Sequence, residues 1–252
     1  MRLYLVPPAL FGTGCVLGFL GLVEWLLRIG ALNQFVIPFP SSVLLSFPRL
    51  FAEEQLLHRL LLTGMEALIA SLLVISFAIG IGMFLHRYRI ARLATESWIA
   101  AAAAAPIVLA YPLFLVSFGR SSATIIAIGF VAGLAPALLK TLEGFQGVRK
   151  TLLDVGHSYN LTRSQLFWMI QFPAAIPTIF TGIRLGLIFT LINLIGVEFL
   201  INFGGLGQLI NDLAERYDLP GVFATIAFVV LVSVFLFSAL ELVERWLRPA
   251  QR

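Results

Sequence analysis

Long apolar stretches constrain this chain more than any other feature. Runs of more than about 18 apolar residues with few charges are typical of transmembrane helices, and the chain contains several. Of its residues, 60% are hydrophobic and 12% are charged, far from the composition of a soluble domain. At about 20 residues per span, the 252 residues allow six spans and short loops. We therefore predict an all-α polytopic membrane protein with six transmembrane helices, folded as one domain over residues 1–252.

The apolar runs also set approximate boundaries for the six spans. A cleaved signal peptide is the alternative for the first run, but this run stays apolar to Leu27 and shows no A-x-A-like cleavage site, so we favour an uncleaved helix. Pro106 and Pro112 interrupt the third run and predict a broken helix. The predicted spans are 5–27, 62–85, 95–118, 122–139, 176–200 and 221–243.

Between the first two spans, we predict that residues 30–60 form a connector with a short helix at about 42–47. We predict a loop at residues 202–220, in which Gly204–Gly207 form a turn or short re-entrant element. Glycines four residues apart allow helices to pack closely. Such pairs occur in three predicted spans: Gly14 with Gly18, Gly129 with Gly133, and Gly182 with Gly186.

Basic residues in short loops predict the orientation of the chain, because they are enriched on the cytoplasmic side. Five basic residues lie near the loops of one side: Arg28, Arg49, Arg59, Arg120 and Arg216. The other side holds many more, namely Arg2, Arg87, Arg89, Arg92, Lys140, Arg149, Lys150, Arg163, Arg184, Arg245, Arg248 and Arg252. This bias predicts that both termini and the polar segment between spans four and five are cytoplasmic, in a multi-pass plasma or inner membrane protein.

The longest polar break, residues 149–173, has the pattern of two short helices. Thr151-x-x-Asp154 and Thr162-x-x-Gln165 have the spacing of capping boxes, which predicts helices at about 151–159 and 163–171. Asn160 between them tolerates the left-handed conformation that ends a helix. Such helices, with aromatic and methionine side chains, could enter a groove on another protein or lie in the lipid headgroup layer. The residue pattern alone leaves both alternatives open.

The same segment resembles the EAA loop of ABC importer permeases. Asp154-Val155-Gly156 stand at the Glu-Ala-Ala positions of that pattern, Asn160 stands at its glycine, and residues 170–173 end it as Ile-Gln-Phe-Pro. Residues 173–177, 182–185, 197–198 and 204–207 extend the likeness, which covers nearly the whole chain. The nitrate, sulfonate and taurine type of permease is the most similar branch, and it also includes permeases for pyrimidine precursors and bicarbonate. Aspartate keeps the charge and Gly156 keeps the small size, while Asn160 keeps the turn.

The resemblance implies a transport subunit that works with partner chains. A cytoplasmic ATP-binding subunit would dock on the loop, an extracytoplasmic binding protein would deliver a small anionic or heterocyclic solute, and two copies of the permease would form the path through the lipid membrane. ATP and magnesium would be held by the ATPase, with no cofactor on this chain. The resemblance places the docking contacts at Asp154, Val155, Gly156, Asn160, Leu166, Phe167, Ile170 and Pro173.

Glu198 and Asn193, in the fifth span, are candidates for the translocation path or gate. An ionisable residue inside a membrane span is costly and is a functional hypothesis by default. The alternative is that Glu198 has no direct role in transport and simply pairs with a nearby donor or reaches water. Glu198 also matches a family position, and Asn193 lies one turn inward.

Other functions find less support in the sequence. No GxxxxGK[ST] motif occurs, so a separate chain must hydrolyse ATP. The three histidines lack metal-site spacing, Cys15 is the sole cysteine, and no catalytic constellation indicates a membrane-embedded enzyme. The net charge of +4 lies beside the spans and does not suggest nucleic acid. An ATPase-independent secondary transporter or channel is the main alternative, but there is no strong charge relay or evident inverted repeat.

Overall fold

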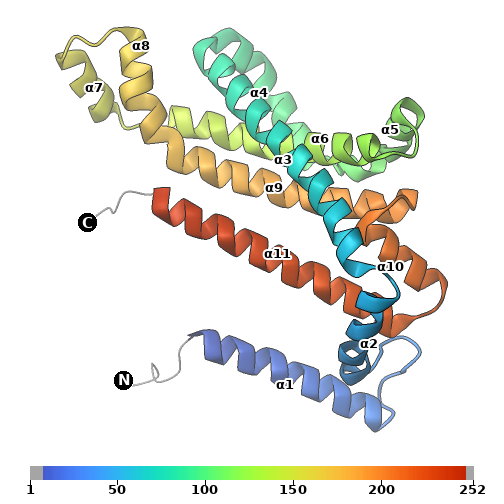
Figure 1. Cartoon of the computed structure of the whole chain (residues 1–252). Coiled ribbons are helices and arrows are strands. Elements are labelled where there is room, and N and C mark those ends of the chain that lie inside the picture. Colours follow the sequence, from blue (N-terminus) through green and yellow to red (C-terminus); the bar gives the residue numbers. More distant parts are fainter. Residues whose placement is uncertain (1–7, 248–252) are drawn as a thin grey trace, which may run out of the picture.

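The computed structural model describes residues 8–247, and every regular element within them is helical. By length and composition, five helices can cross a membrane, and a sixth span results if one bent pair counts as a single span. The predicted all-α membrane fold is thus confirmed. The elements, drawn in Figure 1, are α1 (Pro8–Arg28), α2 (Pro40–Ala52), α3 (Leu56–Arg87), α4 (Arg89–Ala104), η1 (Ile107–Ala110), α5 (Tyr111–Phe118), α6 (Ser122–Gln146), α7 (Lys150–Ser158), α8 (Arg163–Leu166), η2 (Phe167–Gln171), α9 (Phe172–Ile201), α10 (Gly205–Glu215) and α11 (Leu219–Leu247).

The centre of the fold is the close packing of α6 against α9, with α3 laid across both. Gly133 of α6 and Gly186 of α9 face each other. A Cβ atom on Gly133 would lie 2.6 Å from the Gly186 carbonyl oxygen, and one on Gly186 would lie 2.7 Å from the Gly133 carbonyl oxygen. The absence of both side chains lets the two backbones touch, as predicted from the glycine spacing.

The glycines of α1 behave differently. A Cβ atom on Gly14 or Gly18 would have no atom within 4 Å, and the packing of α1 in the described chain is mainly against α2. The predicted glycine contact of this helix is therefore not made by residues 8–247. The predicted first span, 5–27, begins three residues before the described part of the chain.

The third predicted span, 95–118, is not one helix. The helix α4 ends at Ala104, and the chain turns by 89° before η1 and α5. Ala105 is extended, with ψ of 136°, a conformation that the ring of the following Pro106 favours over the helical one. Pro112 lies in the first turn of α5, where its missing N–H costs no hydrogen bond.

The segment 202–220, predicted as a loop, contains the helix α10. Leu206, Leu209 and Leu213 are almost completely buried, and they recur with the three- and four-residue spacing of one helix face. They form a core cluster with Leu50 of α2 and Leu56 of α3. The helix α10 thus fastens the connector after α1 to the body of the protein. Helix α2 is also longer than the predicted 42–47.

The long helices have two distinct ends. Figure 1 shows α7, α8 and the end of α11 at one end, which we call the coupling end, and α2, α5 and α10 at the opposite end. The described residues that were predicted to be cytoplasmic gather at the coupling end. Arg2, Arg248 and Arg252, used for that prediction, lie outside the described residues. Which end faces the cytoplasm stays a prediction.

Candidate functional site

The polar segment forms a short helix, α7, with a well-defined end. Asn160 adopts the left-handed conformation with φ of 52°. The Asn160 amide donates to the His157 carbonyl (2.9 Å), and the Leu161 amide donates to the Gly156 carbonyl (3.1 Å). These are the two hydrogen bonds of a Schellman motif, which satisfies carbonyls that the helix end would leave free. The predicted helix-ending role of Asn160 is confirmed.

The two predicted capping boxes have different outcomes. Thr162 forms one, because its hydroxyl accepts from the Gln165 amide (3.3 Å) and its own amide donates to the Gln165 side chain (2.9 Å). Thr151 does not, since α7 begins at Lys150 with Arg149 as its N-cap and without a side-chain cap. The first helix therefore starts one residue earlier than predicted, and Thr151 lies in its first turn.

The second predicted helix, 163–171, is not separate from the membrane span. Helix α8 continues through the π-helical turn η2 into α9, so that one helix of 39 residues runs from Arg163 to Ile201. The Phe172 amide donates to the carbonyl of Phe167, five residues back. This wider turn comes directly before Pro173, whose ring would crowd a carbonyl of a regular α-helical turn. The predicted break between the helix at 163–171 and the span at 176–200 is therefore absent, because the helix continues through Pro173.

Three of the predicted docking residues pack together at the base of α7. Gly156 is buried, and a Cβ atom there would meet the Leu166 side chain and lie 2.7 Å from Cδ1 of Ile170. Phe167 stacks in an aromatic cluster with Phe145, at a ring distance of 5.7 Å. Leu166 and Ile170 thus form the platform on which α7 rests, whereas Phe167 faces Phe145 of α6. In the described chain α7 packs mainly on α8 and η2.

The outer face of α7 is exposed and partly apolar. Asp154 is exposed, and exposed fractions are 43% for Leu152, 51% for Val155 and 78% for Tyr159. These three apolar side chains lie at i, i+3 and i+7, which places them on one side of the helix. Pro173 is also exposed. The arrangement fits either a protein groove or a lipid surface, the two alternatives left open by the sequence.

At the far end of the same continuous helix, Glu198 is fully buried. Its carboxyl group accepts from the Thr63 hydroxyl (2.7 Å) and from the Gly207 amide (2.8 Å), and the Leu206 amide donates to the Thr63 hydroxyl (2.8 Å). Glu66 of α3 lies near Glu198, so that the two carboxyl groups interact. We call this cluster of Thr63, Glu66, Glu198 and the amides of 206 and 207 the polar junction. It joins α3, α9 and α10.

The polar junction explains the glycines that follow α9. A Cβ atom on Gly205 would lie 2.5 Å from a carboxyl oxygen of Glu198, and one on Gly207 would lie 2.6 Å from its Cβ atom. Gly204 and Gly205 also have positive φ, a conformation that side chains disfavour. The sequence pointed to Glu198 and to these glycines but missed Thr63 and Glu66. A threonine and a glutamate one turn apart in an apolar span were the available signal.

Asn193 belongs to a different surface of α9. Its amide nitrogen donates to the carbonyl of Phe189 in its own helix (2.9 Å). Five helical residues correspond to a rotation of about 140°, so Asn193 does not join Glu198 at the polar junction. An apolar cleft of about 470 Å³ opens between α3, α9 and α11, and its hydroxyl-bearing lining residues are Thr63, Ser71, Thr190 and Ser233.

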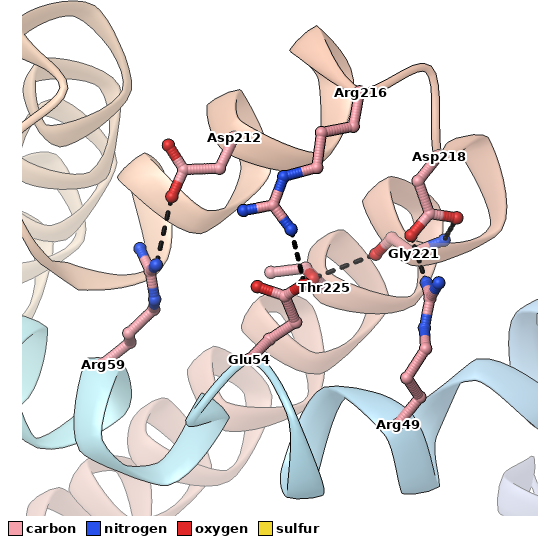
Figure 2. A network of polar contacts seen from close by, with 8 residues as sticks. All are labelled: Arg49, Glu54, Arg59, Asp212, Arg216, Asp218, Gly221 and Thr225. Atoms are coloured by element: carbon pink, nitrogen blue, oxygen red, sulfur yellow. Dashed lines mark hydrogen bonds and ion pairs between the residues drawn. The ribbon is translucent and has the colours of Figure 1, made fainter.

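Ion pairs hold the end of the molecule that carries α10. Figure 2 shows basic and acidic side chains of the α2–α3 segment facing oppositely charged partners at α10 and the start of α11. Arg216 pairs with Glu54 (2.7 Å) and Arg59 with Asp212 (3.0 Å). A third pair joins Arg49 to Asp218. At the coupling end, Arg184 pairs with the buried Glu244 of α11 (3.1 Å).

The described part of the chain holds no cluster of three metal-ligating side chains. Its features are instead an exposed helix at one end, a buried polar junction at the other, and a continuous helix between them.

Curated relatives cover most of the chain. It is 26% identical over 231 residues to a probable ABC transporter permease protein of Brucella abortus, covering 92% of each chain. It is 26% identical to a putative aliphatic sulfonates transport permease protein of Bacillus subtilis, covering 97% of this chain and 86% of that one. The taurine transport system permease protein of Escherichia coli is 24% identical, with 86% of this chain and 81% of the relative covered.

Solved structures share the fold. An inward-facing structure of the MetNI methionine ABC transporter aligns with a TM-score of 0.64 and 14% identity, covering 75% of this chain and 94% of that chain. An amino acid ABC transporter aligns with a TM-score of 0.57 and 18% identity, covering 72% of this chain and 90% of that one.

The match to a family description is decisive, because it spans most of the described chain. Residues 67–249 match the binding-protein-dependent transport system inner membrane component. They include α7, its platform and the Glu198, Leu206 and Gly207 part of the polar junction, whereas Thr63 and Glu66 lie just before the matched residues. The chain therefore belongs to the family of inner membrane permease components of binding-protein-dependent ABC import systems.

Proposed function

We propose that the chain is the permease subunit of an ATP-driven importer, in which a cytoplasmic ATPase subunit docks on α7. The observation that carries this proposal is the exposed apolar face of Leu152, Val155 and Tyr159 on a helix fixed to the end of a membrane span. A helix that only rested in the headgroup layer would not need a rigid link to a span. In an importer that link transmits the movement of the ATPase.

The continuous helix supports a lever mechanism. At about 1.5 Å per residue, the 39 residues from Arg163 to Ile201 span on the order of 60 Å. Movement of α7 reaches α9 through Gly156, Leu166 and Ile170, and α9 carries it to Glu198 and to the cleft between α3, α9 and α11. Closure of the ATPase pair opens the path outward, and hydrolysis resets it. Glu198 then acts as part of the gate by holding α10 against α3 and α9.

The proposed partners follow from this mechanism and from the family. An extracytoplasmic binding protein delivers the solute at the end that carries α10, and a second copy of this chain completes the path. The ATPase holds ATP and magnesium, and this chain itself is neither an enzyme nor a cofactor carrier. The distribution of basic residues supports an inner or plasma membrane location with both termini and α7 in the cytoplasm.

The proposed solute is small and either anionic or heterocyclic. Relatives are described as permeases for taurine, aliphatic sulfonates and formylaminopyrimidine. The cleft between α3, α9 and α11 is lined mainly by apolar side chains, and the basic Arg184 is already paired with Glu244. Selection of the solute is therefore assigned to the binding protein rather than to a charged site in this chain.

The test is recovery of the ATPase with the affinity-tagged full-length chain from its native membrane. Val155→Asp places a charge on the exposed face of α7 and is expected to lower ATPase recovery and solute uptake at least tenfold. Ile90→Asp is the matched control, because Ile90 is also exposed (86%) but lies on α4; it is expected to retain both. Equal recovery with the two variants would refute docking on α7, and full uptake without any ATPase would favour a secondary transporter.

A further inference from the structure

A second cleft, of about 710 Å³, lies between the C-terminal end of α3 and the start of the continuous helix α8–η2–α9. We propose that this cleft binds the phosphate group of an anionic phospholipid. We call it the basic cleft. Its lining residues combine basic, hydroxyl and aromatic side chains: Met83, His86, Arg87, Thr162, Arg163, Ser164, Leu166, Phe167, Trp168 and Gln171.

The charge of the basic cleft is one-sided. Arg87 comes from α3 and Arg163 from α8, and no aspartate or glutamate is among the lining residues. Both arginines are exposed, and neither takes part in a salt bridge within the described chain. Arginine at the opposite end of the molecule is paired with carboxylates, as in Figure 2. Two guanidinium groups from separate helices therefore lack a fixed counter-charge, and guanidinium is well suited to bidentate phosphate binding.

Unused polar atoms gather at the same corner. The Nδ1 atom of His86 is buried without a hydrogen-bond partner, and so is the Nε atom of Arg92 at the adjacent start of α4. The His86 ring packs against Phe145 and Phe167, at ring distances of 5.0 and 6.0 Å. Buried polar atoms are normally satisfied. Of these two side chains His86 lines the basic cleft and Arg92 does not, so the direct contacts to a phosphate are assigned to Arg87 and Arg163.

The apolar part of the cleft favours a lipid over a small soluble phosphate. Met83, Leu166, Phe167 and Trp168 line the cleft together with the arginines. Trp168 is 53% exposed, and tryptophan and arginine are the side chains typical of the membrane–water interface. A phosphate between the two arginines would leave an acyl chain against these apolar groups. Basic pockets between membrane helices bind lipid headgroups in this way.

Binding here would connect α8 to the α3–α4 corner. Because α7 packs on α8 and η2 through Gly156, a lipid in the basic cleft would steady the support of α7 from the side of α3. The proposal does not depend on an ATPase partner, and it can be measured on the purified chain alone.

The experiment titrates the purified full-length chain in neutral detergent with phosphatidylglycerol, with phosphatidylcholine and with inorganic phosphate, and it follows bound adducts by native mass spectrometry. Phosphatidylglycerol is expected to bind about tenfold more tightly than phosphatidylcholine. The double variant Arg87→Gln/Arg163→Gln is expected to lose about 10- to 30-fold in phosphatidylglycerol affinity, from two interfacial arginines. If that variant folds poorly, Arg163→Gln alone is expected to lose about five- to tenfold.

The matched control is Arg89→Gln/Lys150→Gln, which removes the same charge from exposed positions that do not line the cleft. It is expected to change affinity less than about twofold. Inorganic phosphate that displaces phosphatidylglycerol at equal concentration would support the phosphate site but assign it to a free phosphate. Equal losses in both double variants, or no preference for the anionic lipid, would overturn the proposal.

Discussion

Replacing Thr63 by valine is the most direct test of the polar junction. The Thr63 hydroxyl donates to Glu198 and accepts from the Leu206 amide, so it links α3, α9 and α10 through one oxygen atom. Valine has nearly the same shape, and the packing around this 3% exposed residue should change little. The variant therefore removes two hydrogen bonds and leaves the buried Leu206 amide without its partner.

The expected cost can be worked out from these two interactions. Side-chain hydrogen bonds in membrane proteins average about 0.6 kcal/mol and reach about 1.7 kcal/mol. A buried amide that loses its acceptor costs about 1–3 kcal/mol. With one bond to a carboxyl group and one orphaned amide, we expect Thr63→Val to lower the free energy of unfolding by about 2–3 kcal/mol.

Thr225→Val is the matched control. Thr225 is also fully buried, but its hydroxyl donates only to the carbonyl of Gly221 in its own helix (2.9 Å). That carbonyl already accepts a backbone hydrogen bond within α11, so losing the additional bond from the Thr225 hydroxyl should lower the free energy of unfolding by less than about 0.5 kcal/mol. Equilibrium unfolding in mixed detergent micelles measures both variants. Costs within about 0.5 kcal/mol of each other would show that the polar junction does not hold the three helices together.

Two further perturbations test the packing and the ion pairs. Gly133→Ala places a methyl group against the Gly186 carbonyl and is expected to lower the free energy of unfolding by about 2 kcal/mol in the same assay. Gly80→Ala is the control, because its methyl group would meet no atom within 4 Å, and it should be neutral or slightly stabilising. Equal effects of the two variants would contradict the close α6–α9 contact. A double-mutant cycle of Arg59→Gln and Asp212→Asn is expected to give a coupling energy of about 0.5–1 kcal/mol that falls with added salt, and a coupling near zero at low salt would mean that this pair does not fasten α10.

The parts of the fold that were predictable from sequence are those governed by local physics. Long apolar runs form helices, because the membrane interior lacks water to hydrogen-bond with the backbone, and a helix satisfies its N–H and C=O groups within the segment. Asn160 and Thr162 were assigned correctly because left-handed caps and capping boxes depend on a few neighbouring residues. The glycine spacing correctly predicted close packing for α6 and α9 but not for α1, where Gly14 and Gly18 meet no atom within 4 Å, and it did not show which helices would meet.

One error is local, because α7 begins at Lys150 and Thr151 lies inside its first turn, whereas the larger errors came from interactions between distant residues. Thr151 and Thr162 have the same local spacing, but only Thr162 forms the capping box. Helix α10 was missed because Gly204 and Gly205 suggested a loop, although Leu206, Leu209 and Leu213 carry a helical period that packs on Leu50 and Leu56. These glycines make room for the Glu198 side chain, which comes from the preceding helix. Local turn preferences do not reveal such a contact.

The misassigned end of the polar segment matters most for function. A chain that stopped and restarted at Pro173 would place a flexible joint between α7 and the membrane span, and a pull on α7 would be lost in that joint. The π-helical turn η2 instead carries the helix past Pro173 without a break. The same wide turn brings Phe167 against Phe145 of α6, so the lever is supported at the point where proline would weaken it. Glu198 lies at one end of this continuous helix, where Thr63 holds it, and α7, which carries Val155, packs on the other end through Gly156. We therefore expect the exposed face of α7 and the polar junction to be coupled in transport, although they lie at opposite ends of the molecule.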